Sequence, residues 1–146
     1  MIEIASFLSP KTCSYLINFF KKNTNAAKSF KKRFTIPLLN LNSSDIKIKN
    51  IIKKYKAIRP NQSLINIELI YWPIGEYHDW HDDTIYYDYT TITYLNEGYK
   101  GGVTTVEKYI IKPKTGKICL FSSTKKHKVS TLEDGERYVI LAWYKK

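Results

Sequence analysis

Two residues near the middle of the chain have the types and spacing of metal ligands. His81 and Asp83 are separated by a single residue. Alternate side chains of a β-strand project from the same face, so this pair would point to one side, and Trp80 and Asp82 to the other. A His-x-Asp pair can equally be a hydrogen-bonded couple on a protein surface. A metal site therefore needs a third ligand from elsewhere in the chain.

His127 is the candidate third ligand, because it is the only one of the three histidines that lies outside this neighbourhood. It begins a later segment that is typical of a strand, and a rolled sheet can bring that segment beside the first pair. Two histidines and one carboxylate leave coordination positions open, an arrangement that suits non-haem iron(II) and oxygen chemistry. The alternative is a histidine in a basic loop, since Lys126 and Lys128 flank it. His78 is expected at the rim of the site, not as a fourth ligand.

Arg137 is a candidate for holding an anion. By the period of two it shares a strand face with Val139, Leu141 and Trp143. A guanidinium on such an apolar face needs a partner, and its planar fork matches a carboxylate through two hydrogen bonds. The chain otherwise uses lysine almost everywhere, with 21 Lys against 3 Arg. An exposed arginine that follows a turn is the alternative interpretation.

The first part of the chain predicts two short helices and a strand. Ser9-Pro10 is a typical helix start, and the apolar residues that follow predict a helix over about 10–22. Ser44-Asp45 opens a second amphipathic helix, whose apolar stripe includes Ile48 and Tyr55. Residues 33–39 predict an edge strand, because a proline within that run cannot donate to a central ladder. We expect both helices to brace the outside of a sheet.

From residue 64 onward, short β-rich runs alternate with turn signals that contain Gly, Pro or Asp. This spacing is typical of a β-sandwich or barrel. The predicted strands are 64–72, 77–83, 89–95, 102–106, 108–112, 117–122, 127–131 and 136–144.

The length of 146 residues predicts a single domain. Residues 1–60 carry thirteen basic and two acidic residues, which equals the whole net charge of +11, whereas residues 61–146 carry eleven of each sign. We therefore expect a basic, partly helical support over 1–60 and the functional core over 61–146. A basic face can attract nucleic acid, an anionic membrane or an acidic protein, and solvated lysines that keep a small protein soluble are the simpler interpretation.

The chain shows no sign of export or of membrane insertion. No stretch approaches about eighteen apolar residues, and the N-terminus lacks a cationic region, so neither a membrane span nor a signal peptide is expected. Cys13 and Cys119 have no C-x-x-C spacing, which favours buried thiols over a disulfide framework. These features predict a cytoplasmic protein.

Several motifs follow one another in the second half of the chain. They are Tyr71-Trp-Pro-Ile-Gly75-Glu-Tyr77-His-Asp-Trp-His81-Asp-Asp83, Thr91-Ile-Thr-Tyr94-Leu95-Asn96, Gly101-Gly102-Val-Thr104, Pro113-Lys-Thr-Gly116, Leu120-Phe121, His127-Lys-Val129 and Gly135-Glu-Arg137-Tyr-Val-Ile-Leu-Ala-Trp143. In this order they resemble the prolyl 4-hydroxylase-like branch of the Fe(II)/2-oxoglutarate-dependent dioxygenases. The resemblance implies a mainly β fold with N-terminal helices, in which two short helices brace a double-stranded β-helix (jelly roll, cupin-like) core.

The resemblance also assigns roles to residues. It implies that His81, Asp83 and His127 bind iron, that Arg137 pairs with the C5 carboxylate of 2-oxoglutarate, and that Tyr94 hydrogen-bonds the same carboxylate. The remaining residues that resemble co-substrate neighbours, for which plain core packing is the alternative, are Tyr71, Thr104, Val129 and Trp143.

The activity implied is hydroxylation of an unactivated C–H bond with release of succinate and CO₂. The cofactors would be Fe(II), 2-oxoglutarate and O₂, with ascorbate as an optional addition. A protein or peptide is the expected substrate, with a prolyl residue favoured and an acidic partner as a candidate for the basic first part. Tyr86, Tyr87 and Tyr89 lie in a segment that resembles the family's substrate-covering loop, although an edge strand would explain them equally well.

Three alternatives remain open from the sequence. The first is a hydroxylase of a free amino acid or another small metabolite. The second is a nucleic-acid-acting dioxygenase, which is not favoured because no second arginine follows Arg137. The third is a non-catalytic, cupin-like binding module.

Overall fold

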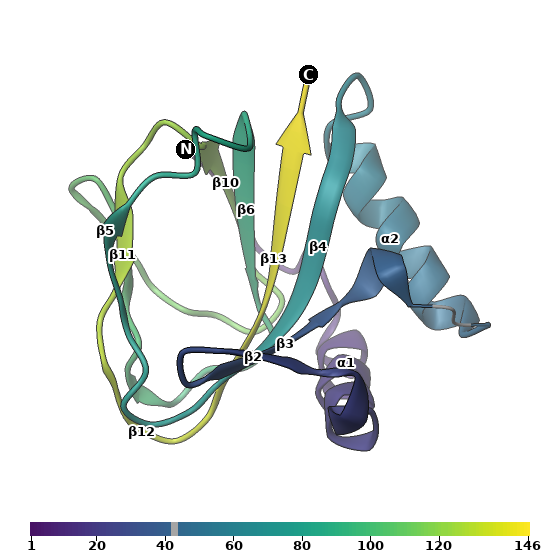
Figure 1. The fold of residues 1–146 in the computed structure, drawn as a ribbon, viewed down its shortest axis with the longest axis horizontal. Helices are drawn as coiled ribbons and strands as arrows, with labels where there is room; N and C mark the ends of the chain where they lie inside the picture. Colours follow the sequence, from purple (N-terminus) through teal and green to yellow (C-terminus); the bar gives the residue numbers. More distant parts are fainter. Residues whose placement is uncertain (42–43) are drawn as a thin grey trace.

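The computed structural model describes residues 1–41 and 44–146. Two antiparallel sheets face each other, and the helices cover the outer side of the larger one (Figure 1). The larger sheet has the order β1 (Ile2–Ile4), β10 (Ile118–Ser122), β6 (Tyr89–Tyr94), β13 (Arg137–Lys145), β4 (Ser63–Trp72), β3 (Arg33–Pro37) and β2 (Lys28–Phe30). The smaller sheet has the order β5 (His78–His81), β11 (His127–Val129), β8 (Thr104–Val106) and β9 (Tyr109–Ile111). A third ladder pairs β12 (Leu132–Asp134) with β7 (Lys100–Gly101). This confirms the mainly β fold with a double-stranded β-helix core.

The two helices begin where their capping residues predict. In α1 (Pro10–Lys22), Ser9 is the N-cap, and its hydroxyl accepts a hydrogen bond of 3.1 Å from the backbone N–H of Thr12. In α2 (Ile46–Ile58), the cap is Asp45 and not the preceding serine. Short 3₁₀ turns, η1 (Thr24–Ala26) and η2 (Leu38–Asn40), complete the helical part. No helix among the described residues is long and apolar enough to cross a membrane.

Every predicted strand is present, with ends that differ by up to two residues. One detail of the prediction is wrong, because β3 is not an edge strand but lies between β4 and β2. Pro37 is tolerated there because β2 pairs only with residues 33–35 of β3, so the proline faces no strand on that side. The strands that the sequence did not predict, β1, β2, β7 and β12, have two or three residues each.

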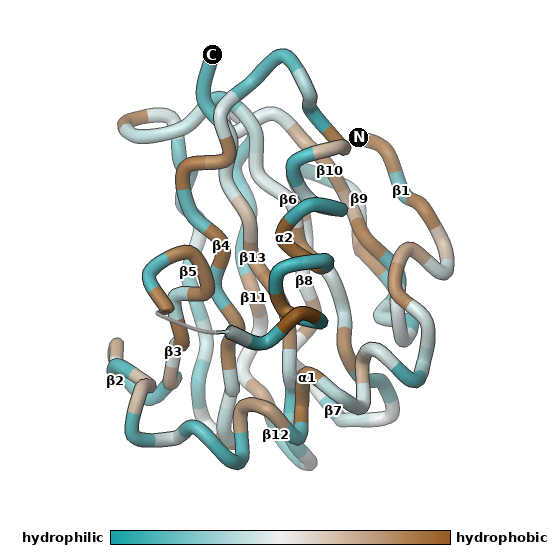
Figure 2. The backbone as a smooth tube through the Cα atoms, turned by 90° about the vertical axis from the view of Figure 1, so that its right-hand side faces the viewer, coloured by the Kyte–Doolittle hydropathy of each residue, from teal (hydrophilic) through white to brown (hydrophobic). Residues whose placement is uncertain are grey.

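The hydrophobic core has two parts, one on each face of the larger sheet. Hydrophobic and hydrophilic residues alternate along α1 and α2 (Figure 2), and the apolar face of each helix packs on the outer face of this sheet. Leu16 and Tyr55 are fully buried there. The second part lies between the sheets and includes Trp72 and Phe121, which also line the cavity described below. Cys13 and Cys119 are both buried and free, which confirms the expectation of buried thiols.

Candidate active site

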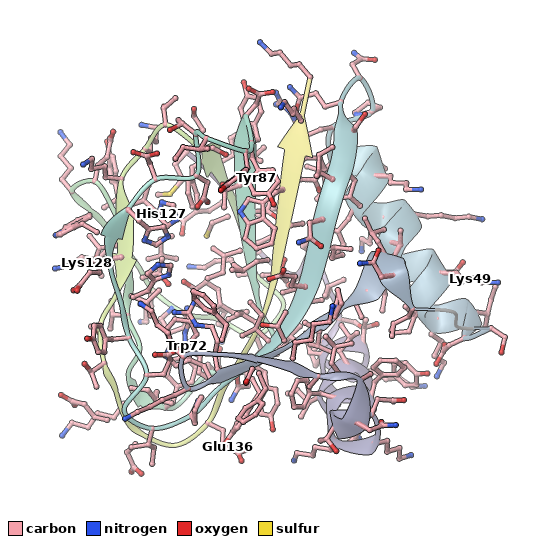
Figure 3. The ribbon with its side chains drawn as sticks, viewed as in Figure 1. Lys49, Trp72, Tyr87, His127, Lys128 and Glu136 are labelled. Carbon is pink, nitrogen blue, oxygen red and sulfur yellow. The ribbon has the colours of Figure 1, made fainter. Side chains whose placement is uncertain are left out.

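A cavity of about 510 Å³ lies between the two sheets. Inward-facing side chains of β4, β6 and β13 form one wall, and those of β5, β8 and β11 form the opposite wall. The predicted face of β13 is correct, since Arg137, Val139, Leu141 and Trp143 all line the cavity. Figure 3 shows the side chain of His127 between the sheets, while Lys49 and Lys128 point away from the centre of the molecule.

The structure brings the predicted metal ligands together. His81 and His127 are direct partners in the antiparallel pairing of β5 and β11. Asp83 lies in the loop just after β5, where its backbone N–H donates a hydrogen bond of 3.0 Å to the carbonyl of Ser123. One ligand atom from each of the three side chains lies within 4.8 Å of the other two. This cluster could therefore hold one metal ion.

Each histidine turns the correct nitrogen toward the cluster. Nδ1 of His81 lies 2.7 Å from the carbonyl oxygen of Asp79, and Nδ1 of His127 lies 2.9 Å from that of Lys125. A carbonyl only accepts hydrogen bonds, so both protons belong on Nδ1 and the lone pairs of Nε2 are free for a metal. Burial lowers the pKa of His81, and the charge of His127 adds to this effect, which favours the neutral ligand form.

The carboxylate of Asp83 is held by two donors. Its Oδ2 accepts hydrogen bonds from Oγ1 of Thr90 at 2.9 Å and from Nε1 of Trp143 at 3.1 Å. Burial alone would raise the pKa of Asp83, but the interactions with His127, Thr90 and Trp143 outweigh it and lower the pKa to about 2. The neighbouring Asp82 is exposed and bonds to Thr84 instead, as expected for a side chain that points away from the cluster.

At the other end of the cavity, Arg137 is almost completely buried, with 1% of its surface exposed. Its Nη2 donates a hydrogen bond of 3.0 Å to Oγ1 of Thr104. Three buried polar atoms near this end have no hydrogen-bond partner among the described residues, namely Nε of Arg137 and the hydroxyls of Tyr94 and Tyr99. Buried donors without partners are costly, and a carboxylate would satisfy them. The residues present therefore fit an anionic co-substrate.

Most of the predicted co-substrate neighbours lie at this cavity. Thr104, Val129 and Trp143 line it. Tyr94 lies behind the lining, fully buried, with its ring centroid 5.9 Å from the guanidinium carbon of Arg137. The expectation for Tyr71 is wrong, because this residue lies on the opposite face of β4.

Tyr71 packs on the helix side of the larger sheet. Its ring centroid lies 5.2 Å from that of Tyr138 and 5.9 Å from that of Phe20 in α1. Alternate side chains of β4 face the cavity, and Trp72 takes the inward position beside Tyr71.

The segment after Asp83 is a loop with a turn, not an edge strand. Tyr87 stacks on Trp143 with ring centroids 5.3 Å apart, so it lies beside the cavity. Tyr86 is 66% exposed. Tyr89 faces the helix side, where Arg59 lies 3.7 Å from its ring centroid, so the expectation of a substrate contact for Tyr89 is wrong.

Sequence reasoning missed a second arginine at the cavity. Arg33, on β3, is buried and bonds through Nε to Oε2 of Glu76 at 2.9 Å. Its guanidinium lies 4.1 Å from the ring centroid of Trp72, and Nη1 lies 3.3 Å from Nδ1 of His78. The signal was available, because Arg33 is one of three arginines in a lysine-rich chain. Sequence reasoning also missed Tyr99, whose buried hydroxyl has no hydrogen-bond partner among the described residues.

His78 links this arginine to the candidate metal cluster. Its imidazole stacks on that of His81, with ring centroids 3.6 Å apart and planes at 11°. Burial lowers the pKa of His78 to about 3, and the charges of His81 and Arg33 contribute to the shift. The ring of His78 is therefore neutral at physiological pH.

Comparison with known proteins identifies the family. The model of the 2OG-Fe(II) oxygenase superfamily matches residues 69–145, and the chain belongs to this superfamily. It is a 2-oxoglutarate-dependent dioxygenase, and its cofactors are Fe(II), 2-oxoglutarate and O₂. No curated protein matches the chain.

Solved structures share the fold over nearly the whole chain. A viral collagen prolyl hydroxylase from Paramecium bursaria Chlorella virus-1, in complex with 2OG, aligns with a TM-score of 0.71 at 18% identity, covering 98% of this chain and 93% of the other. A Pseudomonas putida prolyl-4-hydroxylase gives 0.76 at 15% identity, with coverages of 99% and 91%. The non-heme alpha ketoglutarate dependent epimerase SnoN from nogalamycin biosynthesis gives 0.77 at 10%, with coverages of 98% and 76%. At these identities the likeness establishes the fold.

Proposed function

We propose that this dioxygenase hydroxylates an unactivated C–H bond in a protein or peptide, with a prolyl residue as the favoured acceptor. The observation that carries the proposal is the likeness over nearly the full chain to two solved prolyl hydroxylases, combined with a cavity that joins a His-Asp-His cluster to a buried arginine. In the overall reaction one atom of O₂ enters the new hydroxyl group. The other enters succinate as 2-oxoglutarate loses CO₂.

The proposed iron ligands are Nε2 of His81, a carboxylate oxygen of Asp83 and Nε2 of His127. Three protein ligands leave coordination positions open for the co-substrate and oxygen. When bound, the iron supplies the oxidising chemistry for C–H hydroxylation. The protein holds the ligands ready, since Thr90 and Trp143 fix the orientation of the carboxylate.

Arg137 is the proposed partner of the far carboxylate of 2-oxoglutarate. Thr104 orients the guanidinium through its hydroxyl, which leaves Nε available. The hydroxyls of Tyr94 and Tyr99 are the other candidate donors to the same carboxylate. Apolar side chains of the lining exclude water around the chain of the co-substrate, among them Ile92, Phe121, Val129, Val139 and Leu141.

Tyr86 and Tyr87 are the proposed substrate contacts beside the metal site. Tyr87 stacks on Trp143, and Trp143 donates a hydrogen bond to Asp83. Trp143 thus connects the loop that carries Tyr86 and Tyr87 to the candidate metal cluster. The exposed ring of Tyr86 and the 82% exposed side chain of Ile85 present an apolar surface on the same loop. Such exposed apolar groups are suited to contact with a macromolecular substrate.

The test of this function separates iron chemistry from substrate choice. Purified protein with Fe(II), 2-oxoglutarate and O₂ is first assayed for succinate without a substrate. His81→Ala, Asp83→Ala and His127→Ala should each abolish succinate formation, whereas Asp82→Ala, the exposed neighbour, should retain it. Full turnover in any correctly folded triad variant would contradict the ligand assignment.

The acceptor is then identified by mass spectrometry. Peptides with and without proline, free amino acids and oligonucleotides are incubated with the active enzyme and searched for products heavier by one oxygen atom. The proposal expects oxygen on peptidyl proline. Exclusive hydroxylation of free amino acids would favour a hydroxylase of small metabolites. Exclusive oxidation of nucleic acid would favour a nucleic-acid-acting dioxygenase.

A further inference from the structure

Glu68 is a carboxylate on the wall of the cavity that the proposed chemistry does not use. It lies on β4, where it projects to the same side as Asn66, Ile70 and Trp72. Its neighbours across the sheet are Leu141 of β13 and Pro37 of β3. The side chain is half-buried. It therefore faces the enclosed space, not the open solvent around the molecule.

Glu68 makes no ion pair with any residue in the described part of the chain. Its single hydrogen bond there comes from Nδ2 of Asn66, at 2.9 Å to Oε1. Burial raises the pKa of Glu68, and the hydrogen bond from Asn66 and the charge of Arg33, which is itself bonded to Glu76, oppose this rise only in part. Lys28 also lines the cavity but makes no ion pair with Glu68. A partly desolvated carboxylate is costly unless a cation or several donors approach it, so this one is poised to accept a partner.

The surroundings of Glu68 connect it to the metal cluster through Asn66 and Trp143. Asn66 is the direct partner of Trp143 in the β4–β13 pairing, and Trp143 donates to Asp83. Tyr87 stacks on Trp143. Burial raises the pKa of Tyr87, and the charges of Glu68 and Asp83 both add to the rise. We call these four residues, Asn66, Glu68, Tyr87 and Trp143, the Glu68 corner.

A carboxylate, an amide oxygen and two aromatic side chains form a typical environment for an organic cation. The carboxylate gives a charge-assisted hydrogen bond, and aromatic faces attract ammonium and guanidinium groups. An anionic group would be repelled, and a neutral one would leave the carboxylate without its partner. The chemistry of the corner therefore selects by charge.

We propose that the Glu68 corner is a subsite for a cationic group of the substrate, an ammonium or guanidinium carried close to the carbon that is oxidised. This inference rests on the proposed function and deepens it. In a peptide substrate, a lysyl or arginyl residue next to the hydroxylated prolyl residue occupies the corner. The cation and the oxidised carbon then approach the metal cluster from the same side of the cavity.

The test compares matched peptides with the iron-loaded enzyme. The peptides are identical except for the residue next to proline, which is lysine, arginine, Nε-acetyl-lysine or glutamate. The wild type should hydroxylate the lysine and arginine peptides with a kcat/KM about tenfold or more above that of the acetyl-lysine peptide. Two further probes distinguish the possible sources of the cation. One is a peptide whose only cation is its N-terminal amine, and the other is free lysine.

Variants of Glu68 assign the selectivity to this residue. Glu68→Gln keeps the shape and should remove the preference, while Glu68→Lys should shift it toward the glutamate peptide. Glu136→Gln is the matched control, because Glu136 is an exposed carboxylate outside the cavity and should leave the preference intact. Thermal unfolding of each variant verifies that it is folded.

The outcomes distinguish the subsite from the function on which it rests. Succinate formation without substrate should persist in all Glu68 variants, and its absence in the wild type would contradict the proposed function itself. The subsite is overturned if turnover persists but no cationic probe is preferred. It is also overturned if Glu68→Gln retains the wild-type preference.

Discussion

Nε1 of Trp143 donates a hydrogen bond of 3.1 Å to Oδ2 of Asp83, across 60 positions of sequence. Trp143 lies near the end of β13, and Asp83 lies in the loop after β5, so the bond joins the larger sheet to the candidate metal cluster. The other oxygen, Oδ1, faces Nε2 of His81 at 3.9 Å. The indole thus fixes the carboxylate orientation in addition to forming a wall of the cavity.

We expect Trp143→Phe to weaken Fe(II) binding by about 10- to 100-fold, because partners that orient metal ligands have effects of this size. The phenyl ring keeps most of the apolar wall but cannot donate to Asp83. Fe(II) titration of the apoprotein under anaerobic conditions measures the effect. Trp80→Phe is the matched control, since Trp80 is 48% exposed and should leave affinity unchanged. Equal iron affinity in wild type and Trp143→Phe would contradict the positioning role.

Arg137→Ala should raise the KM for 2-oxoglutarate strongly. Removal of one partner of a buried charge pair typically costs about 2–5 kcal/mol, which is roughly 30-fold or more in binding. Arg137→Lys should be intermediate, because a point charge replaces the planar fork. The measurement is succinate formation against 2-oxoglutarate concentration. Arg59→Ala, far from the cavity, serves as control, and an unchanged KM in both Arg137 variants would place the carboxylate elsewhere.

A pair of glycines allows a test of how tightly Arg137 is positioned. Gly102 has φ +60°, and a Cβ there would lie 3.0 Å from Cδ of Arg137. Gly98 has φ +88°, and a Cβ there would meet nothing within 4 Å. Both alanine substitutions carry backbone strain of about 1 kcal/mol or more, because the left-handed region disfavours side chains. Gly102→Ala alone should also raise the KM for 2-oxoglutarate. A matching rise in Gly98→Ala would show that strain alone is responsible.

Much of the fold was predictable, because it depends on patterns that are local in sequence. The caps at Ser9 and Asp45 set the helix starts, and runs of alternating residues mark the longer strands. Strands of two or three residues show no detectable period, so β1, β2, β7 and β12 were missed. The position of β3 inside the sheet depends on its hairpin pairing with β2, a strand of three residues that is too short to show a period.

The site was predictable where motif order and strand alternation agree. Alternation placed Arg137 and Trp143 on one face correctly. Alternation also puts Tyr71 and Trp72 on opposite faces of β4, but it does not indicate which of them faces inward, and the structure shows that Trp72 does. Arg33 stands out in the sequence as one of three arginines, but its contact with Glu76 spans 43 positions, so only the fold shows that it lies at the cavity.

The buried pair of Arg33 and Glu76 should control stability in acid. Burial by itself would raise the pKa of Glu76, but the hydrogen bond and charge of Arg33 outweigh it and hold the pKa below 4.5. A carboxyl whose folded pKa is depressed contributes stability that is present above its unfolded pKa and is lost as pH falls through the folded pKa. This contribution is therefore complete above about pH 4.5 and declines below it.

Glu76→Gln should lower the free energy of unfolding at neutral pH by about 3–5 kcal/mol, because it leaves Arg33 buried without its partner. Urea unfolding from pH 7 down to pH 3 measures this difference. The gap between wild type and variant should shrink as the pH falls below about 4.5, because the carboxyl of the unfolded wild type then binds a proton more readily than that of the folded protein. Glu133→Gln, in an exposed ion pair, should have little effect. A gap that stays constant with pH would contradict the pairing.

The basic face of α2 is expected to attract a macromolecular substrate without taking part in the chemistry. Lys49, Lys53 and Lys56 are exposed there, and Lys49 points away from the sheets (Figure 3). Lys47 lies over the ring of Tyr15, and Lys54 bonds to the carbonyl of Phe7, so these two support the fold and are left unchanged. The first three are therefore the residues to neutralise.

Replacing these three lysines with glutamine should weaken binding of an acidic protein substrate and flatten its salt dependence, because screened long-range attraction is lost. Succinate formation without substrate should be unchanged, since the helix lies outside the cavity. The control carries the same charge change elsewhere, at the exposed Lys108, Lys112 and Lys146. Equal weakening in both variants would mean that net charge alone attracts the substrate. Tight binding of nucleic acid with a steep salt slope, and stimulation of turnover by it but not by peptides, would assign the face to a nucleic-acid substrate instead.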